Sequence, residues 1–323
     1  SSAEDRIKNP VQAEARSRIS PRIGISFPIT ERDVFHVNYG HYFGIASLGN
    51  LYDNHTWSLL GAFRYLGNPN LDHEKIISYE AGIQHGFTDD VKLTVTGFFK
   101  DIDDLVNKQK YIDVNTGAPY WVNTNADFGN VKGFEVSINT RRWYNTILNV
   151  AYTYQIAKGK NSDQEQSFLD DYNRRRPRTD EFFLDWDVRH TVAANFDYRI
   201  PVGYFGNAWI DDWGINLIMT YNSGRPYTSA NTVPPPNLPP VNDKRYPSWT
   251  NVDMRLFKNF TVWESIKFGA FFEVFNLLND RTVRTIMNTE QYDLGADEGD
   301  GTQNVPWAWA DPTQMRLGFE ILF

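Results

Sequence analysis

The feature that most constrains this chain is an alternation of apolar and polar residues with a period of two. In residues 266–274, Ile266 and Phe268 alternate with Lys267 and Gly269, and the pattern continues to Val274. Successive side chains of a β-strand point to opposite faces, so such a segment has one apolar and one polar face. No stretch approaches the roughly 18 apolar residues that a membrane helix needs. The pattern therefore predicts strands and excludes a helical membrane protein.

About eleven segments carry this alternation, each near the roughly 10 residues of a membrane-barrel strand. The connections between them are short and long in turn, which is typical of an outer-membrane barrel with periplasmic turns and extracellular loops. A soluble β-sandwich is the alternative, but it has no reason to segregate loop lengths. The predicted strands are 21–29, 33–42, 76–87, 91–104, 127–141, 146–158, 186–200, 213–227, 248–261, 265–278 and 314–323, and the predicted long loops are 43–75, 105–126, 159–185, 228–247 and 279–313.

Composition agrees with this fold. Aromatic residues make up 15% of the 323-residue chain, which suits the aromatic girdles of a membrane barrel. The formal net charge of −8 argues against a nucleic-acid-binding protein, and the absence of cysteine excludes disulfides and thiolate metal sites. Residues 1–20 contain no apolar signal-peptide segment.

Strand parity predicts how the chain fits into a barrel. If the last strand ends in the periplasm, the first of eleven strands also runs inward, and an odd number of strands does not close a bacterial single-chain barrel. We therefore expect an all-β, transmembrane, antiparallel up-and-down β-barrel in which this chain supplies about 11 C-terminal strands of about 22. Residues 1–20 would end an extracellular loop, and residues 21–323 would form the barrel part, with a periplasmic C-terminus in the outer membrane.

Several motifs, in their order and spacing, carry a family resemblance. The chain resembles the C-terminal half of a TonB-dependent outer-membrane receptor, although His73 stands where that family usually has proline. The matching motifs are LGNPNLDHEK (66–75), SYEAG (78–82), GFEV (133–136), NSGRPY (222–227), FNLLN (275–279) and the terminal strand from Arg316 to Phe323.

The resemblance implies a receptor that imports a scarce nutrient with energy from TonB. A ferric siderophore is the first expectation for the substrate, and an oligosaccharide or a peptide is the alternative. A plug domain and a TonB box would lie upstream of this chain. The implied partners are TonB, outer-membrane lipid and lipopolysaccharide, the barrel-assembly machinery and a surface lipoprotein. A passive porin or a structural, partner-docking barrel explains the alternation equally well.

The candidate substrate-binding residues are polar aromatic and cationic groups in the loops and at the mouth. Arg225 and Tyr227 follow a strand near the mouth, where Pro226 ends ladder pairing. Tyr120 with Trp121, and Trp307 with Trp309, would stack on a sugar or an aromatic ligand. The alternatives are an aromatic belt for Tyr227 and the two other pairs, and an ion pair in the lumen for Arg225.

The last strand is a candidate signal for barrel assembly. Phe319, Ile321 and Phe323 continue the apolar side of the alternation to the last residue. In the class that the chain resembles, a terminal aromatic strand of this kind is read by the barrel-assembly machinery. The alternative is a simple apolar strand end.

Three loops offer weaker candidates. Residues 233–240 form a proline-rich stretch that suits an extended loop or a docked partner, and Arg174–Arg176 suit anionic ligands. The acidic stretch 293–300 suits calcium, although its spacing is not that of an EF-hand. The six histidines have no metal-binding spacing, and we find no catalytic motif. We therefore expect no cofactor, no metal and no enzyme.

Overall fold

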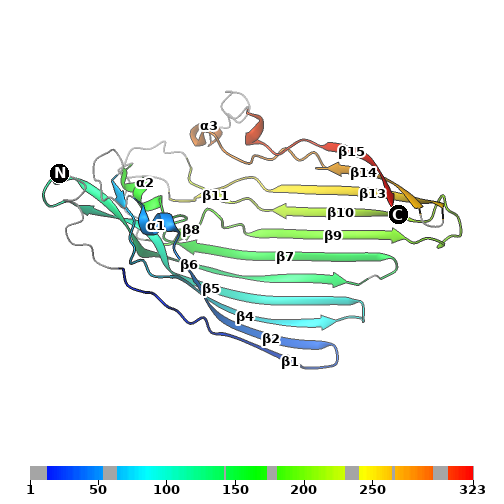
Figure 1. Cartoon of the computed structure of the whole chain (residues 1–323), viewed down its shortest axis with the longest axis horizontal. Helices are drawn as coiled ribbons and strands as arrows, with labels where there is room; N and C mark the ends of the chain where they lie inside the picture. The colour runs from blue at the N-terminus through cyan, green and yellow to red at the C-terminus, as the bar shows by residue number, and fades with distance from the viewer. Residues whose placement is uncertain are drawn as a thin grey trace.

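The computed structural model describes residues 13–53, 64–141, 143–172, 180–229, 240–263, 266–293 and 305–322. Eleven strands follow one another as antiparallel neighbours in a single curved sheet, in sequence order (Figure 1). They are β1 (Arg22–Pro28), β2 (Asp33–Gly44), β4 (Glu74–Gly86), β5 (Val91–Ile112), β6 (Pro119–Thr140), β7 (Thr146–Gly159), β9 (His190–Ile200), β10 (Trp213–Asn222), β13 (Trp249–Trp263), β14 (Ile266–Phe275) and β15 (Gln314–Leu322).

Short elements decorate one end of this sheet. They are β3 (Tyr65–Leu66), β8 (Phe182–Phe183), the pair β11 (Pro226–Tyr227) and β12 (Lys244–Arg245), the helices α1 (Leu48–Tyr52), α2 (Gln166–Tyr172) and α3 (Thr289–Asp293), and the 3₁₀ turn η2 (Pro306–Ala308). No helix in the described part of the chain has the length and apolar character needed to cross a membrane. The all-β up-and-down fold predicted from the alternation is confirmed.

The strand register joins the alternating residues into two continuous faces. Ile25 pairs with Val37, Val37 with Ala81, and the same parity continues across the sheet to Phe272 and Leu317. We call this side the apolar face and the opposite side, which carries Arg255, Glu273 and Arg316, the polar face. Residues of the apolar face remain exposed, as Leu317 does at 65%.

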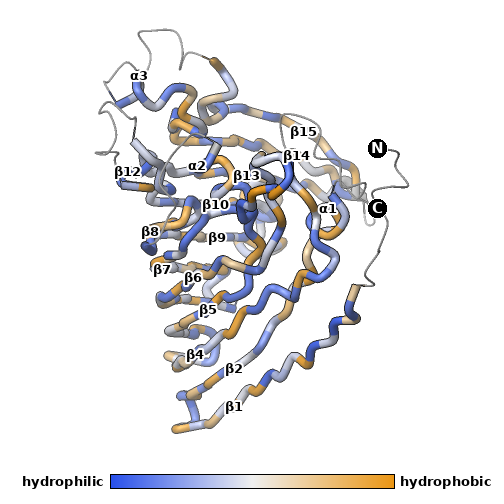
Figure 2. Tube along the Cα trace, turned by 90° about the vertical axis from the view of Figure 1, so that its left-hand side faces the viewer, coloured by the Kyte–Doolittle hydropathy of each residue, from blue (hydrophilic) through white to orange (hydrophobic). Residues whose placement is uncertain are grey.

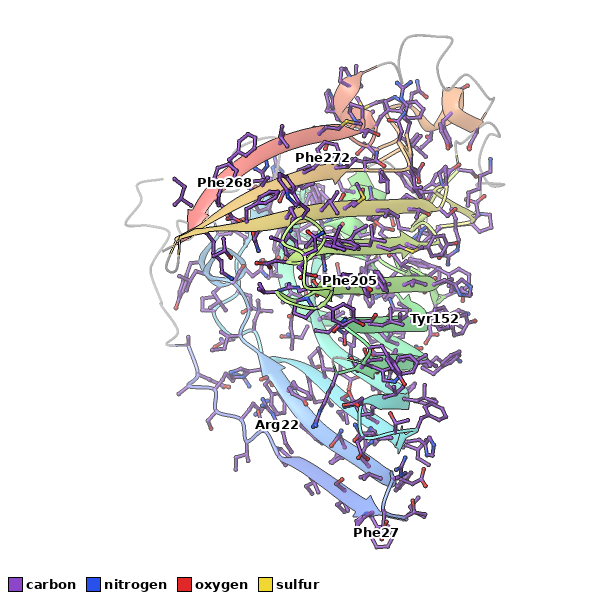
Figure 3. All side chains as sticks on the ribbon, turned by 90° about the vertical axis from the view of Figure 1, so that its right-hand side faces the viewer. Arg22, Phe27, Tyr152, Phe205, Phe268 and Phe272 are labelled. Carbon is purple, nitrogen blue, oxygen red and sulfur yellow. The ribbon has the colours of Figure 1, made fainter. Side chains whose placement is uncertain are left out.

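The figures show the same two faces. Apolar and polar residues alternate along the strands, which together form an arc (Figure 2). Three residues of the apolar face, Phe27, Tyr152 and Phe268, lie at the outer rim of this curved sheet (Figure 3). The polar face therefore lines the inner side of the arc.

The two ends of the sheet differ. The connections β1–β2, β4–β5, β6–β7, β9–β10 and β13–β14 gather at the right of Figure 1, and we call this the short-turn end. The connections with added helices and small strands lie at the opposite, long-loop end. Residues 14–18 also lie there, because the backbone N–H of Glu14 donates to Asn70 at 2.9 Å and the guanidinium of Arg18 pairs with Asp72.

Two predicted boundaries are wrong. Residues 105–126 are mostly an extension of the β5–β6 hairpin, which turns at residues 113–118, and not a long loop. The ladder is interrupted where Asp104 has φ of +60° and then resumes. The predicted strand 213–227 also ends at Asn222, and residues 226–227 pair with β12 instead of continuing β10.

Candidate ligand site at the long-loop end

A cavity of about 700 Å³ opens where β10, β13, β14 and β15 reach the long-loop end. Its lining combines these strand ends with residues 280–284 and 310–312. Cationic, acidic and aromatic side chains all contribute, among them Arg225, Arg284, Asp311, Tyr246, Trp249 and Phe275. Ligand pockets of a few hundred to a thousand Å³ with few polar groups are typical of small-molecule sites.

Gly224 turns the chain away from β10 to form one wall of this cavity. Its φ of +82° is a conformation that glycine adopts readily, and a Cβ at this position would lie 2.0 Å from the carbonyl oxygen of Tyr246. The close approach brings Arg225 next to Tyr246, so that the guanidinium carbon lies 4.9 Å from the ring centroid. A planar guanidinium above an aromatic ring is a favourable cation–π arrangement.

Asn276 closes the opposite wall. It has φ of +51°, is only 7% exposed, and its side-chain N–H groups donate to the carbonyl oxygens of Asp280 at 3.1 Å and Asp311 at 2.8 Å. Its backbone N–H donates to Asp253 Oδ1 of β13 at 2.9 Å. One side chain therefore ties the end of β14 to both loops that line the cavity.

Most charges of the lining already have partners. Asp280 accepts from the backbone N–H of Thr250 at 2.7 Å and from the hydroxyl of Thr282 at 2.7 Å. Asp311 pairs with Arg284 at 3.0 Å. Arg225 is exposed and, within the described residues, has no ion-pair partner. The cation of the lining that is open to a ligand is therefore Arg225, beside the aromatic groups Tyr246, Trp249 and Phe275.

Comparisons with known proteins decide the family. The model of the TonB-dependent receptor-like β-barrel matches residues 3–277. The chain belongs to the TonB-dependent receptor β-barrel family. This family is one of outer-membrane β-barrel receptors, which are transporters and not enzymes. Comparison with curated protein sequences gives no significant match.

Solved structures of TonB-dependent receptors share the fold. YddB of Escherichia coli matches with a TM-score of 0.63 and 13% identity over 94% of this chain and 40% of its own. The ferripyoverdine receptor of Pseudomonas aeruginosa matches with a TM-score of 0.59 and 13% identity, over 95% of this chain and 33% of its own. The ferric-catecholate import receptor Fiu of E. coli matches with a TM-score of 0.55 and 18% identity, over 93% of this chain and 34% of its own. The chain thus spans about a third of the length of these receptors.

Two of the six predicted binding residues, Arg225 and Tyr227, lie in the segment that follows β10 at one side of the cavity. Arg225 lines the cavity itself, as described above. Tyr227 lies in β11 beside it and donates its hydroxyl hydrogen to Asp293 Oδ1 at 2.8 Å. Burial, and then this bond to Asp293, raises the pKa of the Tyr227 phenol above its ordinary value. Tyr227 is therefore a neutral hydrogen-bond donor that holds α3.

Trp307 and Trp309 flank another part of the same wall. Trp307 lies in η2 and is 61% exposed, whereas Trp309 forms a β-bridge with Val283, which lines the cavity. Between them Ala308 is fully buried, and its carbonyl oxygen accepts from the backbone N–H of Arg284 at 2.7 Å. Trp307 is the exposed indole of the pair and stays a candidate for ligand contact.

Tyr120 and Trp121 lie elsewhere, on β6. The Tyr120 ring stacks on Tyr111 across the hairpin at 5.7 Å. Trp121 is only 7% exposed and packs edge-on against Phe168 of α2 at 4.9 Å. The structure therefore does not bring this pair to the cavity.

Several important residues were not singled out from the sequence. Tyr246, Arg284 and Asp311 come from loops without a motif, and only the FNLLN motif gave a signal for Asn276. Fully buried Asp187 was also missed; it accepts from the backbone N–H of Ala157 at 2.6 Å and pairs with Arg189 and Arg245. Its contacts hold β12, next to the cavity, against β7.

Some sequence candidates cannot be placed. Phe323, Arg174–Arg176, most of the proline-rich stretch and most of the acidic stretch lie outside the described residues. Phe319 and Ile321 lie on the apolar face of β15 and are 63% and 59% exposed. In the described ranges, no group of three or more His, Cys, Asp or Glu side chains has the arrangement of a metal site.

Proposed function

We propose that the receptor to which this chain belongs imports a ferric siderophore, or a similar anionic metal chelate, by TonB-energised transport. Family membership supports receptor-type import across the outer membrane. Among the related structures are a ferric-catecholate import receptor and a ferripyoverdine receptor. The cavity at the long-loop end would form part of the ligand site, with the long loops outside the cell and the short turns in the periplasm.

The observation that carries the proposal is the exposed Arg225 guanidinium above Tyr246. A cation that has no carboxylate partner suits an anionic ligand, and aromatic side chains suit the rings of a catecholate or another aromatic chelator. A neutral oligosaccharide would use the aromatic surfaces but gain little from the arginine. Arg225 therefore separates the two substrate classes.

The test is ligand binding to the full-length receptor carrying Arg225→Ala or Arg225→Lys. We expect Arg225→Ala to weaken binding of a ferric catecholate chelate by roughly tenfold, which is about 1.4 kcal/mol. Arg225→Lys keeps the charge but loses the planar stack, and should have an intermediate effect. Binding is measured by quenching of tryptophan fluorescence, and Arg32→Ala, at the short-turn end, is the control.

Unchanged binding of the ferric chelate by Arg225→Ala would exclude this role for the arginine. Binding of a neutral oligosaccharide or a peptide instead of any ferric chelate would assign the receptor to the alternative substrate class. Conductance separates an active receptor from a passive porin, because an open porin gives steady, large channels in planar bilayers. The full-length receptor should give none.

We also propose partners that follow from the family and from the last strand. TonB would act on a segment upstream of this chain, and lipopolysaccharide and a surface lipoprotein would contact the long-loop end. Phe319 and Ile321 are exposed on β15, which fits recognition of this strand by the barrel-assembly machinery. Replacing both by serine should reduce the amount of folded receptor in the outer membrane, measured by its heat-modifiable mobility in gels.

A further inference from the structure

The β9–β10 turn, residues 201–212, is an ordered structure at the short-turn end. Asp211 is 3% exposed, and its carboxylate accepts from the backbone N–H groups of Phe205 at 2.8 Å and Asn207 at 3.1 Å. The backbone N–H of Asp211 in turn donates to the carbonyl oxygen of Asn207 at 2.9 Å. Gly203 and Gly206, at φ of +78° and +71°, allow the tight path.

Three contacts place this turn over the apolar face of the sheet. Lys258 has the parity of the apolar face in β13, and its ammonium donates to the carbonyl oxygens of Ala208, at 2.8 Å, and Asp211. The Trp209 ring meets Phe260, which has the same parity, at 5.8 Å. Ile200, the last residue of β9, also has the parity of the apolar face and is only 2% exposed.

The last residue of the turn reaches the other face. Asn259 and Lys267 have the parity of the polar face, and Asp212 accepts from the Asn259 amide at 3.2 Å and pairs with Lys267 at 3.6 Å. The turn therefore contacts residues of both faces of the sheet. These contacts fix its position relative to β13 and β14.

The surface that the turn presents is aromatic and apolar. Trp209 is 79% exposed, Tyr204 and Phe205 are both 56% exposed, and Ile210 is 49% exposed. Figure 3 views the molecule from the short-turn end and labels Phe205. Residues 201–212 contain no lysine or arginine. Tyrosine and tryptophan favour the boundary between lipid headgroups and acyl chains, where the ring is apolar and its polar group stays hydrated.

We propose that turn 201–212 is an interfacial anchor that inserts Tyr204, Phe205 and Trp209 into the phospholipid headgroup region at the short-turn end. The exposed apolar face of the strands, which continues directly into the turn at Phe260, argues for lipid as the occupant. The anchor also explains Lys258, because an ammonium on a lipid-facing strand is costly unless its donors are satisfied. The turn supplies two carbonyl oxygens for it.

The test measures the membrane depth of single positions in the full-length receptor. This chain has no cysteine, so Trp209→Cys gives a unique label site once any cysteine outside the chain is replaced. The variant is labelled with a nitroxide and reconstituted in phosphatidylethanolamine–phosphatidylglycerol vesicles. Accessibility to oxygen, which partitions into lipid, is then compared with accessibility to a water-soluble nickel chelate. Phe319→Cys is the lipid control and Val114→Cys, at a turn residue that is 94% exposed, is the water control.

We expect the label at 209 to be more accessible to oxygen than to nickel, as at 319 and unlike at 114. A label at 209 that is as accessible to nickel as the label at 114 would overturn the anchor. A label shielded from both reagents would also overturn it, because it would report burial against protein.

A second variant tests the part of the proposal that concerns Lys258. Lys258→Met leaves the carbonyl oxygens of Ala208 and Asp211 without this donor, so the turn should loosen and nickel accessibility at 209 should rise at least twofold. Lys132→Met, at an exposed lysine of the same face in β6, should leave it unchanged. An unchanged label in Lys258→Met would exclude the lysine as the clamp. These readouts need no substrate, so they stand or fall separately from the proposed transport function.

Discussion

The strand wall and the mouth of this molecule are stabilised in different ways. The wall, by which we mean the eleven sequential strands, repeats one pattern of pairing and facing from β1 to β15. The mouth, by which we mean the segments that connect strands at the long-loop end, depends on individual side chains that bond to the backbone. Asn276 is an example, because its side-chain amide donates to the carbonyl oxygens of Asp280 and Asp311. Gly224 adds a close backbone approach to Tyr246 that leaves no room for a side chain.

The wall also repeats a packing unit on its polar face. An aromatic ring lies where a neighbouring strand has glycine, and a cation lies over the ring. In one such unit a Cβ on Gly318 would lie 2.2 Å from the Phe271 ring, and the Arg255 guanidinium carbon lies 4.5 Å from the centre of that ring. Two further units combine Phe257 at Gly214 with Arg199, and Phe98 at Gly133 with Lys100.

This difference teaches where each region is sensitive. Substitutions that remove contacts in the wall should lower the free energy of unfolding of the whole barrel. Substitutions that remove contacts in the mouth should have local effects, on ligand binding or on hydrogen exchange of a few backbone amides. Four predictions test this contrast.

The largest effect is expected for Glu273→Ala in the wall. Glu273 is 7% exposed and links Arg255 of β13, at 3.1 Å, with Arg316 of β15. Its removal leaves Arg316 without this partner and Arg255 with only the more distant Glu320, and both arginines are half-exposed, so we expect a loss of about 2.5 kcal/mol in the free energy of unfolding, just below the range for a fully buried pair. Urea unfolding of the refolded receptor measures it.

Glu320→Ala is the matched control, because Glu320 is 39% exposed and lies 3.9 Å from the same Arg255. It should cost about 0.5 kcal/mol or less. Equal losses for the two variants would show that bridging across three strands adds no stability.

Asn276→Ala should have the next largest effect, confined to the mouth. The variant loses two amide donors and forces alanine into a positive φ, at about 2 kcal/mol in total. Hydrogen exchange of residues 276–284 should become faster while exchange in β4–β7 stays unchanged. Asn276→Gly keeps the backbone conformation and should recover about half of the loss. Faster exchange across β4–β7 would contradict the separation of mouth and wall.

Gly318→Ala tests the packing unit of the wall. The added methyl group meets the Phe271 ring, which must move, so we expect a loss of about 1.5 kcal/mol in stability. Gly97→Ala is the control, because a Cβ there has its nearest neighbours at 3.9 and 4.0 Å. Adding Phe271→Leu to Gly318→Ala should relieve the clash. If the stability losses of the two single variants simply add in the double variant, the clash between the methyl group added at position 318 and the Phe271 ring is not the cause of the Gly318→Ala loss.

The smallest effect is expected for Asp72 in the mouth. Hydrogen bonding from the backbone N–H of His73, followed by the charges of Arg18 and Arg16, lowers the pKa of the Asp72 carboxyl below its ordinary 3.8. The stabilisation is therefore complete above that ordinary value and is lost as the pH falls through the lower folded value.

Asp72→Asn should accordingly cost about 0.5 kcal/mol at pH 7, since the pair is partly exposed, and nothing at strongly acid pH. The stability difference between the two proteins, measured by urea unfolding over a pH series, tests this. If the stability difference between the two proteins grows as the pH falls, Asp72 does not stabilise the fold as a carboxylate.

Sequence reasoning predicted the wall well and the mouth poorly. The alternation predicted all eleven strands, because each wall residue faces either apolar surroundings or the polar inner side. The polarity of each side chain therefore indicates its face. The β5–β6 extension was missed because its polar residues are typical of a loop. Several of them are buried by distant segments: Lys108 is 4% exposed and pairs with Glu165, and Asn123 is 2% exposed and donates to the carbonyl oxygen of Asn50 at 2.9 Å.

The sequence by itself determined the order of the eleven strands, the side of each strand that is apolar and the resemblance to the family. These follow from local periodicity and from motif order, which a chain carries whatever its long-range contacts are. Only the tertiary structure decided which predicted residues meet. It placed Arg225 over Tyr246, buried Trp121 under α2 and laid turn 201–212 over Lys258. Each of these pairs joins segments with no local pattern in common, so only the folded sheet determines their proximity.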